Sequence, residues 1–451
     1  MGRALVEGQK REEWQSRWGF ILATVGSAVG LGNVWRFPTM VVRGGGGAFL
    51  ILYLGLVLLI GIPALVMELS LGRRANRNTL GAFSHLRPGS RWWLVGALSM
   101  LAVFVVLSFY SVIAGWSLIY LVGSTAGIFS QQGPAALTET FTRLSEHPFL
   151  PATAAALFIG LTASVVASGV AHGIERVSKA LLPAMVLLLV VLMFRSLFLE
   201  GALGGALWLI RPDPEALNLQ TALAALGQVF FSFSLGMGAV ITYGSYLSRG
   251  SDIPRNSLII GFSDVGIAIL AALVVVPALF ALGISPEIGP GVIFVTLLGI
   301  FNTLPFPAIW ASLFFLMLTF AALTSTIAML EVLVAYLVDE KRWSRSLAST
   351  LLAVLILVAA LPSALGQGVL NHIEIAGLTI LDAADQLVSN LMLPVAGLMT
   401  AVFVGWVWGT GPVSLELSLG STRSRLSRLI TLAIRYILPI GMAYILITGI
   451  L

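Results

Sequence analysis

The strongest constraint on this chain is a series of long apolar runs that recurs from one end to the other. The runs 50–67, 94–122, 258–282 and 429–451 reach or approach the roughly 20 residues that a helix needs to cross a bilayer. Only 10% of the residues are charged, whereas a soluble domain carries about 25%. So few charges cannot cover a water-soluble core. We therefore predict an all-α integral membrane protein that forms one domain over residues 1–451.

Charged and Pro/Gly-rich loops divide the apolar sequence into eleven predicted transmembrane helices. Most Lys and Arg residues fall in loops that share one side of the membrane if these helices alternate in direction. The positive-inside rule then makes segment 1–17 cytoplasmic. We expect the protein in the cell inner (plasma) membrane, with its C-terminus on the outside. No cleavable signal precedes the first helix. The predicted helices are 18–40, 46–72, 92–123, 151–170, 176–197, 219–247, 256–284, 308–338, 347–361, 382–407 and 429–450.

Glycine-rich segments interrupt the first and sixth predicted helices in mid-membrane, at 26–33 and 232–238. These two helices correspond if 18–197 and 219–407 form two five-helix repeats and 429–450 is an extra helix. Interrupted helices at corresponding places are typical of transporter binding sites. Close packing through small residues would explain one such segment. It explains less well a matched pair with polar side chains at membrane depth.

Other functions find little support in the sequence. Without cysteine, and with four scattered histidines, the chain offers no metal-binding constellation of the zinc type. The glycine runs lack the Lys-Ser/Thr ending of a phosphate-binding loop. Nucleic-acid binding needs basic residues on one soluble face, and here they lie in membrane loops. We expect neither an enzyme nor a nucleic-acid partner.

The run 28–38, followed by 44–49, carries a family resemblance. Together with matches at 61–68, 110–116, 232–246, 323–325 and 382–385, it resembles the neurotransmitter:sodium symporter family over essentially the whole chain. The resemblance implies the fold of the bacterial leucine transporter, with two inverted five-helix repeats whose first helices are broken. It also implies sodium-coupled import of a hydrophobic L-α-amino acid, aliphatic or aromatic, by alternating access.

By the same resemblance, the amides of Leu31 and Gly32 and the Tyr110 hydroxyl hold the substrate carboxylate. Helix N-termini favour such anions. Gly30 leaves room for a carboxylate where relatives that carry monoamines have Asp, which favours α-amino acids. The implied substrate-binding residues are Ala28, Leu31, Gly32, Val106, Tyr110, Ile113, Phe231, Ser232, Ser234, Met237, Ser325, Thr326 and Met329.

Two sodium sites are also implied by the resemblance. Sodium is a hard cation that prefers oxygen ligands, and a substrate carboxylate shared with the first site would make substrate and sodium binding reinforce each other. For Thr324 and Ser325 alone, a simpler explanation is that Thr and Ser in helices commonly bond back to their own backbone. The first site comprises Ala28, Asn33, Ser232 and Asp264, and the second comprises Gly26, Val29, Ala321, Thr324 and Ser325.

Asp264 departs from the family pattern, which commonly has Asn at this position. A carboxylate inside a membrane costs about 2.5–3.5 kcal/mol, so it is expected to be functional and paired. We predict that Asp264, near Tyr53 and Gln228, supplies the negative charge that chloride supplies in relatives. Transport is then independent of chloride, and uptake of a proton by Asp264 on the return step is left open.

The resemblance further implies two ion pairs that act as gates. Exposed ion pairs contribute only about 0–1 kcal/mol, which suits a contact that must open. Gly173 and Pro183 are expected to let the fifth helix unwind, since proline weakens a helix locally. Glu68 and Glu331 lie within spans, and we assign neither a role. The gates are Arg36 with Asp385 on the outer side, and Arg11 with Asp339, Trp14 and Tyr246 on the inner side.

Several alternatives remain open at this stage. The substrate could be another small zwitterion, such as a β- or γ-amino acid. A non-transporting amino-acid sensor on the same fold would show a degraded sodium site or a signalling domain, and neither is visible. An ion channel would show a pore-lining polar ring. The sequence does not give the preferred amino acid, the sodium stoichiometry or the oligomeric state.

Overall fold

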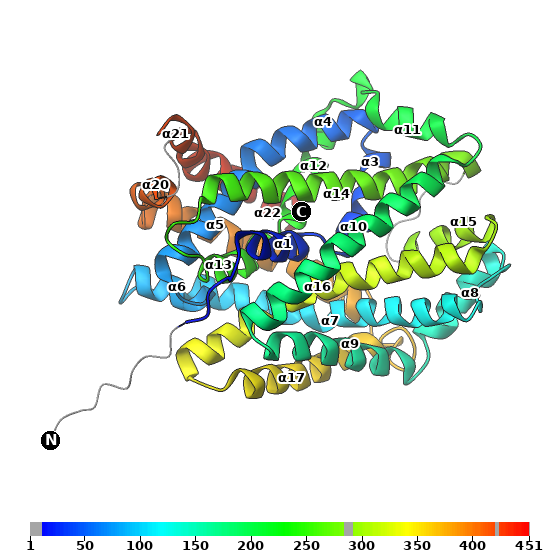
Figure 1. Cartoon of the computed structure of the whole chain (residues 1–451), viewed down its shortest axis with the longest axis horizontal. Helices are drawn as coiled ribbons and strands as arrows, with labels where there is room; N and C mark the ends of the chain where they lie inside the picture. Colours follow the sequence, from blue (N-terminus) through cyan, green and yellow to red (C-terminus); the bar gives the residue numbers. More distant parts are fainter. Residues whose placement is uncertain (1–10, 284–291, 420–423, 451) are drawn as a thin grey trace.

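The computed structural model describes residues 11–283, 292–419 and 424–450. Parts of the predicted cytoplasmic segment (1–10), the end of the seventh predicted helix and Leu451 lie outside these ranges. Within them, the regular elements are helices, and the β structure is limited to two isolated β-bridges. The long helices run side by side along the longest axis of the molecule (Figure 1).

The first half of the chain begins with a helix that is interrupted twice. In order, its elements are α1 (Arg17–Ala28), α2 (Leu31–Val34), α3 (Arg36–Arg43), α4 (Gly47–Leu56), the π-turn η1 (Val57–Gly61), α5 (Ile62–Ala75), α6 (Thr79–Leu86), α7 (Trp93–Thr125), α8 (Pro134–Ser145), α9 (Leu150–Ala167), the π-turn η2 (Val170–Glu175) and α10 (Arg176–Leu197).

The second half contains another interrupted helix and several further π-turns. Its elements are α11 (Ala202–Ile210), the 3₁₀ turn η3 (Pro214–Ala216), α12 (Leu219–Ser232), α13 (Ala239–Gly244), α14 (Ile253–Leu282), η4 (Val292–Leu297), α15 (Leu298–Asn302), α16 (Pro307–Lys341), α17 (Arg345–Leu365), α18 (Ile380–Gln386), η5 (Leu387–Met392), α19 (Leu393–Val402), η6 (Phe403–Val407), α20 (Thr410–Ser418), α21 (Ser424–Leu432), η7 (Ala433–Ile437) and α22 (Leu438–Ile450).

Nine helices in the described ranges are long and apolar enough to cross a bilayer, and α1 with α2–α3 adds a pair bent by 65°. Most predicted boundaries agree with these spans to within a few residues. The predicted helix 347–361 is longer in the structure, because Pro362 lies inside α17 rather than ending it. The predicted helix 219–247 is divided into α12 and α13, each too short to cross alone.

Short helices occupy regions that the sequence analysis treated as loops. Four of them are α6, α8, α11 and α20, which lie towards the two ends of the bundle (Figure 1). They are too short, or not apolar enough, to be recognised as spans. In α8, Pro134 occupies the start of the helix, and Leu137 is buried in the core. Phe141 also packs against the core and stacks on Phe294, so tertiary packing stabilises this short helix.

The break between α12 and α13 comes from backbone conformations that a regular helix cannot contain. Ser234, Gly236 and Gly238 all have positive φ, of 50°, 83° and 78°. A Cβ on Gly236 would lie 2.7 Å from the Leu393 carbonyl oxygen, so this position requires glycine. The sequence analysis anticipated this interruption from the same glycines.

Two side chains from neighbouring helices satisfy the unwound backbone. The carboxylate of Glu68, on α5, accepts a hydrogen bond of 3.0 Å from the Gly236 amide. The hydroxyl of Thr79, on α6, donates one of 2.7 Å to the Gly238 carbonyl oxygen. Unpaired backbone groups are costly in a membrane interior. Glu68, which had no predicted role, therefore stabilises the second helix break.

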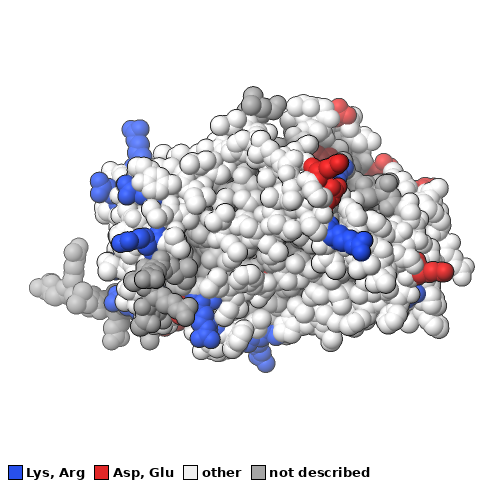
Figure 2. Space-filling model, turned by 90° about the horizontal axis from the view of Figure 1, so that it is seen from above, with Lys and Arg blue, Asp and Glu red and all other residues white. Residues whose placement is uncertain are grey.

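The middle of the visible face in Figure 2 is a broad region without charged residues. Lys and Arg gather mostly towards the left end, and Asp and Glu mostly towards the right end. A wide uncharged band between charged ends is the surface expected of a bilayer-spanning protein.

Candidate functional site

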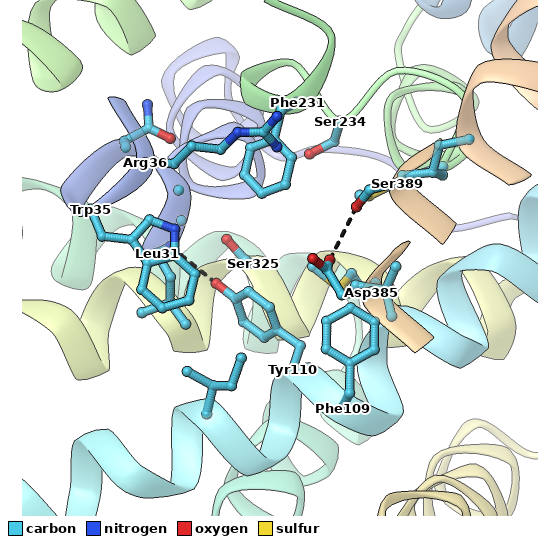
Figure 3. A pocket seen from close by; sticks show the side chains of 18 of the residues that line it. Leu31, Trp35, Arg36, Phe109, Tyr110, Phe231, Ser234, Ser325, Asp385 and Ser389 are labelled. Atoms are coloured by element: carbon cyan, nitrogen blue, oxygen red, sulfur yellow. Dashed lines mark hydrogen bonds between the residues drawn. The ribbon is translucent and has the colours of Figure 1, made fainter. Parts of the chain in front are cut away.

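The two helix breaks face a cavity of about 300 Å³ near the middle of the bundle (Figure 3). Its wall is formed by α1–α3, α7, the α12–α13 break, α16, α18, Ser389 of η5 and Leu393 of α19. The wall is mostly apolar with a few polar groups, which is typical of a small-molecule site. Its lining residues are Ser27, Ala28, Gly30, Leu31, Gly32, Asn33, Trp35, Arg36, Thr39, Met40, Val106, Phe109, Tyr110, Ile113, Phe231, Ser234, Met237, Ser325, Met329, Leu381, Asp382, Asp385, Ser389 and Leu393.

Most of the predicted substrate residues meet in this wall, but Ser232 and Thr326 do not. The Thr326 hydroxyl lies 2.8 Å from the Thr162 hydroxyl on α9 and bonds back to the Leu323 carbonyl oxygen. Successive residues of a helix point about 100° apart, so Ser325 faces the cavity while its neighbour faces α9. Ser232 is buried at the end of α12, outside the lining.

The polar end of the cavity lies at the break in the first helix. α1 ends at Ala28, and Val29 and Gly30 are extended before α2 begins at Leu31. The Leu31 amide donates a hydrogen bond of 3.2 Å to the Tyr110 hydroxyl oxygen. This geometry leaves the hydroxyl hydrogen of Tyr110 available to a bound acceptor.

Gly30 is held close to α7 and α16. A Cβ at this position would lie 2.9 Å from the Ser325 hydroxyl oxygen and 3.0 Å from the Tyr110 hydroxyl oxygen. A larger side chain, such as Asp, would therefore fill the polar end of the cavity. The glycine keeps that space open for a ligand group.

Asp264 of α14 is fully buried beside the first helix break. The side-chain amide of Asn33 donates a hydrogen bond of 2.8 Å to one carboxylate oxygen. The Tyr53 hydroxyl donates a long one of 3.5 Å to the other oxygen. The predicted neighbourhood of Asp264 with Asn33 and Tyr53 is thus present.

Two polar side chains of α12 remain unsatisfied at the same depth. The Ser232 hydroxyl and both polar atoms of the Gln228 side chain are buried without a hydrogen-bond partner among the described residues. Gln228 was expected near Asp264, but no hydrogen bond joins them in the described part of the chain. Buried polar atoms without partners are costly and call for an explanation such as an ion or water.

The residues predicted for the second sodium site lie together between α1 and α16. The Ser325 hydroxyl donates to the carbonyl oxygens of Val29 at 3.3 Å and Gly26 at 3.5 Å. The Thr324 hydroxyl bonds back to the Ala321 carbonyl oxygen at 3.0 Å. Three carbonyls and two hydroxyls form an all-oxygen set, which is the ligand type that hard cations prefer.

The predicted outer gate residues both line the cavity but do not touch. The guanidinium of Arg36 lies 4.4 Å from the centre of the Phe231 ring. Asp385 accepts a hydrogen bond of 3.0 Å from Ser389 and makes no ion pair with Arg36 in the described structure. Figure 3 shows the two charged groups across the cavity from each other.

The predicted inner gate residues are in contact. Arg11 forms an ion pair of 2.8 Å with Asp339, and its guanidinium lies 4.9 Å from the centre of the Tyr246 ring. The Trp14 indole donates a hydrogen bond of 3.0 Å to the Tyr243 carbonyl oxygen. The Trp14 ring also packs edge-on against Tyr243 and Tyr246.

A buried carboxylate extends this inner contact. Glu331 of α16 is fully buried, accepts a hydrogen bond of 2.6 Å from the Tyr246 hydroxyl and forms an ion pair with Arg345. Glu12 lies 3.8 Å from Arg345. Glu331, which the sequence analysis left without a role, therefore connects α16 to the inner gate.

Gly173 and Pro183 lie in one continuous span, which combines η2 and α10. Gly173 is in η2, and Pro183 is inside α10. The N-terminal segment is attached to the ends of η2. Glu12 accepts a hydrogen bond from the Val170 amide, and Glu175 accepts one of 2.7 Å from the Ser16 hydroxyl.

Several lining residues were missed by the sequence analysis, among them Trp35, Phe109, Leu381 and Ser389. Phe109 could have been found, because it lies three residues after Val106 on a helix, where such residues share a face. Leu381 and Ser389 could not, because only the packing of α18 and η5 against α7 brings them to the cavity.

A cavity between two interrupted helices, with oxygen-rich groups at membrane depth, defines a membrane transporter of the broken-helix class. A family model described as the sodium:neurotransmitter symporter family matches residues 11–133 and 150–451. The chain belongs to this family. It is therefore a multi-pass membrane protein and a sodium-coupled transporter, and not an enzyme.

Two relatives and one solved structure illustrate the similarity. The sodium-dependent transporter YhdH of Bacillus subtilis is 36% identical over 92% of this chain and 92% of its own length. A sodium-dependent transporter of Methanocaldococcus jannaschii is 34% identical over 89% of this chain and 82% of its own length. The crystal structure of MhsT in complex with L-phenylalanine is similar with a TM-score of 0.88 and 43% identity, covering 97% of this chain and 100% of that one.

Proposed function

We propose that this protein imports hydrophobic L-α-amino acids together with sodium by alternating access. The observation that carries the proposal is the cavity between the two helix breaks, which has a polar end at Leu31 and Tyr110 and an otherwise apolar wall. The similarity to MhsT, which was crystallised with L-phenylalanine, supports the same class of substrate. An apolar wall disfavours acidic or basic side chains, which would be buried unpaired.

In this proposal the amides of Leu31 and Gly32 and the Tyr110 hydroxyl hold the carboxylate. The carbonyl oxygens of Ala28, Phe231 and Ser232 receive the ammonium group. The substrate side chain occupies the apolar part of the cavity, which is lined by Val106, Ile113, Met237 and Met329. The two methionines are flexible and adapt to side chains of different shape.

Two sodium ions accompany the substrate. The first is bound by Ala28, Asn33, Ser232 and Asp264 together with the substrate carboxylate, which couples ion and substrate binding. The buried, unsatisfied Ser232 hydroxyl supports an ion at this place. The second is bound by the oxygen set of Gly26, Val29, Ala321, Thr324 and Ser325, whose grouping between α1 and α16 supports it.

Transport is independent of chloride, because Asp264 provides the negative charge beside the first sodium. Its complete burial and its bond to Asn33 support this role. Uptake that collapses when chloride is replaced by gluconate would contradict it. In an Asp264→Asn variant we expect uptake to become dependent on chloride.

The proposed architecture has eleven spans, with 18–197 and 219–407 as inverted repeats and 429–450 as an extra helix. The single transporter domain lies in the inner membrane, with segment 1–17 cytoplasmic and the C-terminus outside. The matched breaks of α1–α2 and α12–α13 support the repeats. The grouping of basic residues at the N-terminal end supports the orientation (Figure 2).

Alternating access then opens and closes the two ends in turn. Arg36 and Asp385 close the outer end, and Arg11, Asp339, Trp14 and Tyr246 close the inner end. Gly173 and Pro183 allow the span of η2 and α10 to unwind when the inner end opens. The separated outer pair and the joined inner pair support an outward-open arrangement for the described structure.

Uptake of radiolabelled leucine and tryptophan into proteoliposomes tests the proposal. We expect accumulation with an inward sodium gradient and none when potassium replaces sodium. Asn33→Ala and Thr324→Ala should abolish it. Ser312→Ala is a matched control on α16, because the Ser312 hydroxyl bonds back to the Ala308 carbonyl oxygen and lies outside the ion group.

The remaining outcomes separate the alternatives. Sodium-dependent binding of leucine without uptake would contradict symport and favour a sensor. Uptake of a β- or γ-amino acid in preference to leucine would contradict the assignment of the substrate class while leaving sodium coupling in place.

A further inference from the structure

Arg435 is a charged residue inside an apolar span. It lies in η7, eight residues after the start of the span Ser427–Gly449, or about 12 Å along the helix axis at 1.5 Å per residue. Arginine at such depth is costly unless its charge is paired or reaches the interface. The transport mechanism proposed above gives this residue no role, so its environment requires a separate explanation.

Two aromatic rings hold the guanidinium of Arg435. Its central carbon lies 4.6 Å from the centre of the Trp406 ring and 5.6 Å from that of Tyr436. The Trp406 indole donates a hydrogen bond of 3.1 Å to the Arg435 carbonyl oxygen, which fixes the ring against η7. Trp406 is 54% exposed and Tyr436 is 46% exposed. The cation is therefore held between two rings that are exposed on the surface of the bundle, and Arg435 itself is half-buried.

Within the described ranges, no protein anion neutralises this charge. The Nε atom of Arg435 is buried without a hydrogen-bond partner, and no described carboxylate forms an ion pair with the guanidinium. The exposed neighbours on the same helix, Leu432, Ile437 and Ile440, are apolar. Because the surrounding surface faces the bilayer, the missing anion must come from the membrane or from solution.

The preceding span ends beside Arg435, which brings the guanidinium within reach of the bilayer edge. Trp406 is the second-last residue of the span Ile380–Val407, and tryptophan is typical of the membrane interface. Both contributing helices change to π-turns here, η6 and η7, and π-turns are frequent at functional sites. Arg428 is exposed one heptad before Arg435 and adds positive charge on the same side.

We propose that Arg435, Trp406 and Tyr436 bind the phosphate group of an anionic phospholipid. The planar guanidinium suits two parallel hydrogen bonds to phosphate oxygens. The exposed side chains of Ile437 and Ile440 lie towards the membrane centre, where they contact the acyl chains. In the proposed orientation the lipid belongs to the inner leaflet. The apolar flank favours a lipid over free phosphate, which would gain nothing from it.

Native mass spectrometry of the full-length protein tests this proposal with dioleoylphosphatidylglycerol and dioleoylphosphatidylcholine as probes. We expect preferential retention of phosphatidylglycerol, and about a fivefold loss of that preference in Arg435→Gln. Arg435→Lys should retain part of it, because it keeps the charge but not the two-pronged geometry. Arg249→Gln is the matched control, since it removes the same charge from an exposed loop at the same end.

Three results would overturn the proposal. They are unchanged preference in Arg435→Gln, an equal loss in Arg249→Gln, and displacement of the lipid by millimolar inorganic phosphate. If Arg435→Gln does not fold, Trp406→Leu serves instead, because it removes one ring and leaves the cation in place. Retention of lipid is measured without transport, so its outcome is independent of the proposed function.

Discussion

Arg36 and Asp385 stand apart on the cavity wall, whereas Arg11 and Asp339, which lie outside that wall, are joined at 2.8 Å. The outer residues each have a different partner, the Phe231 ring for Arg36 and the Ser389 hydroxyl for Asp385. The inner pair is surrounded by further bonds, including a hydrogen bond of 3.0 Å from the Asn78 amide to Asp339. The predicted outer gate therefore depends on one ion pair that is not formed, whereas the predicted inner gate has several contacts that are formed.

This difference indicates how each end can be opened. In the proposed mechanism the inner end is closed by a segment of chain, 11–16, and this segment contacts α13, α16 and η2 at the same time. Breaking one contact leaves the others in place, so we expect graded effects at this end. At the outer end a substitution cannot break a bond that is absent. It can only prevent one from forming.

The largest effect is expected from Trp14→Ala. It removes a ring that packs on Tyr243 and Tyr246 and a hydrogen bond to the Tyr243 carbonyl oxygen. A loss of about 3 kcal/mol would shift the equilibrium towards an open inner end more than a hundredfold. Because the chain has no cysteine, a Thr24→Cys reporter on the buried face of α1 can measure this by thiol labelling. Unchanged labelling would show that Trp14 does not hold the inner end closed.

A smaller shift is expected from Tyr246→Phe. It removes the hydroxyl that bonds Glu331 at 2.6 Å and leaves the buried carboxylate with Arg345 alone. The cost of an incompletely satisfied buried group is about 1–3 kcal/mol. The Thr24→Cys reporter should label faster, by less than in Trp14→Ala. Tyr444→Phe on α22 is a matched control, because its hydroxyl makes no hydrogen bond within the described structure, and labelling equal in both variants would contradict the role of Glu331.

Arg11→Gln should have a comparable or smaller effect. The ion pair with Asp339 is largely buried, with side chains 16% and 17% exposed, and a cation–π contact to Tyr246 adds to it. We expect a destabilisation of about 1–2 kcal/mol. Arg77→Gln is the control, since its pair with Glu340 involves a side chain that is 47% exposed and should be worth about 0–1 kcal/mol. Equal labelling rates in the two variants would show that burial does not strengthen the inner pair.

The smallest effect on the resting state is expected from Asp385→Asn. Asp385 forms no ion pair in the described structure, so the labelling rate of Thr24→Cys should change by less than about twofold. Leucine uptake should nevertheless fall, because the outer end could no longer close on Arg36. Glu374→Gln, in an exposed loop, should change neither quantity. Loss of sodium-dependent leucine binding without loss of closure would assign Asp385 to the substrate site.

The sequence predicted the parts of the site that depend on local conformation. The glycines at 26–32 and 236–238 marked both helix breaks, and Gly236 and Gly238 have the positive φ that a regular helix cannot contain. The family resemblance named many, but not all, of the residues that line the cavity. It also located the oxygen atoms between α1 and α16.

The remaining features depend on contacts between distant segments. Glu68 caps the break near Gly236, and Glu331 joins Tyr246, yet neither partner is visible from the residues around each glutamate. Thr326 was predicted to face the cavity and instead bonds to Thr162, because the rotation of α16 is set by packing against α9. The short helices α8 and α20 are likewise stabilised by what they cover rather than by their own composition.

The hydrogen bonds that join Ser325 to the Gly26 and Val29 carbonyl oxygens tie α1 to α16, which is itself attached to α7 and α9 through Ser117 and Thr162. A sodium ion bound among these oxygens would hold α1 against α16. Each tenfold drop in sodium concentration would weaken this attachment by about 1.4 kcal/mol. The cell would therefore set the direction of transport simply by keeping its cytoplasm poor in sodium.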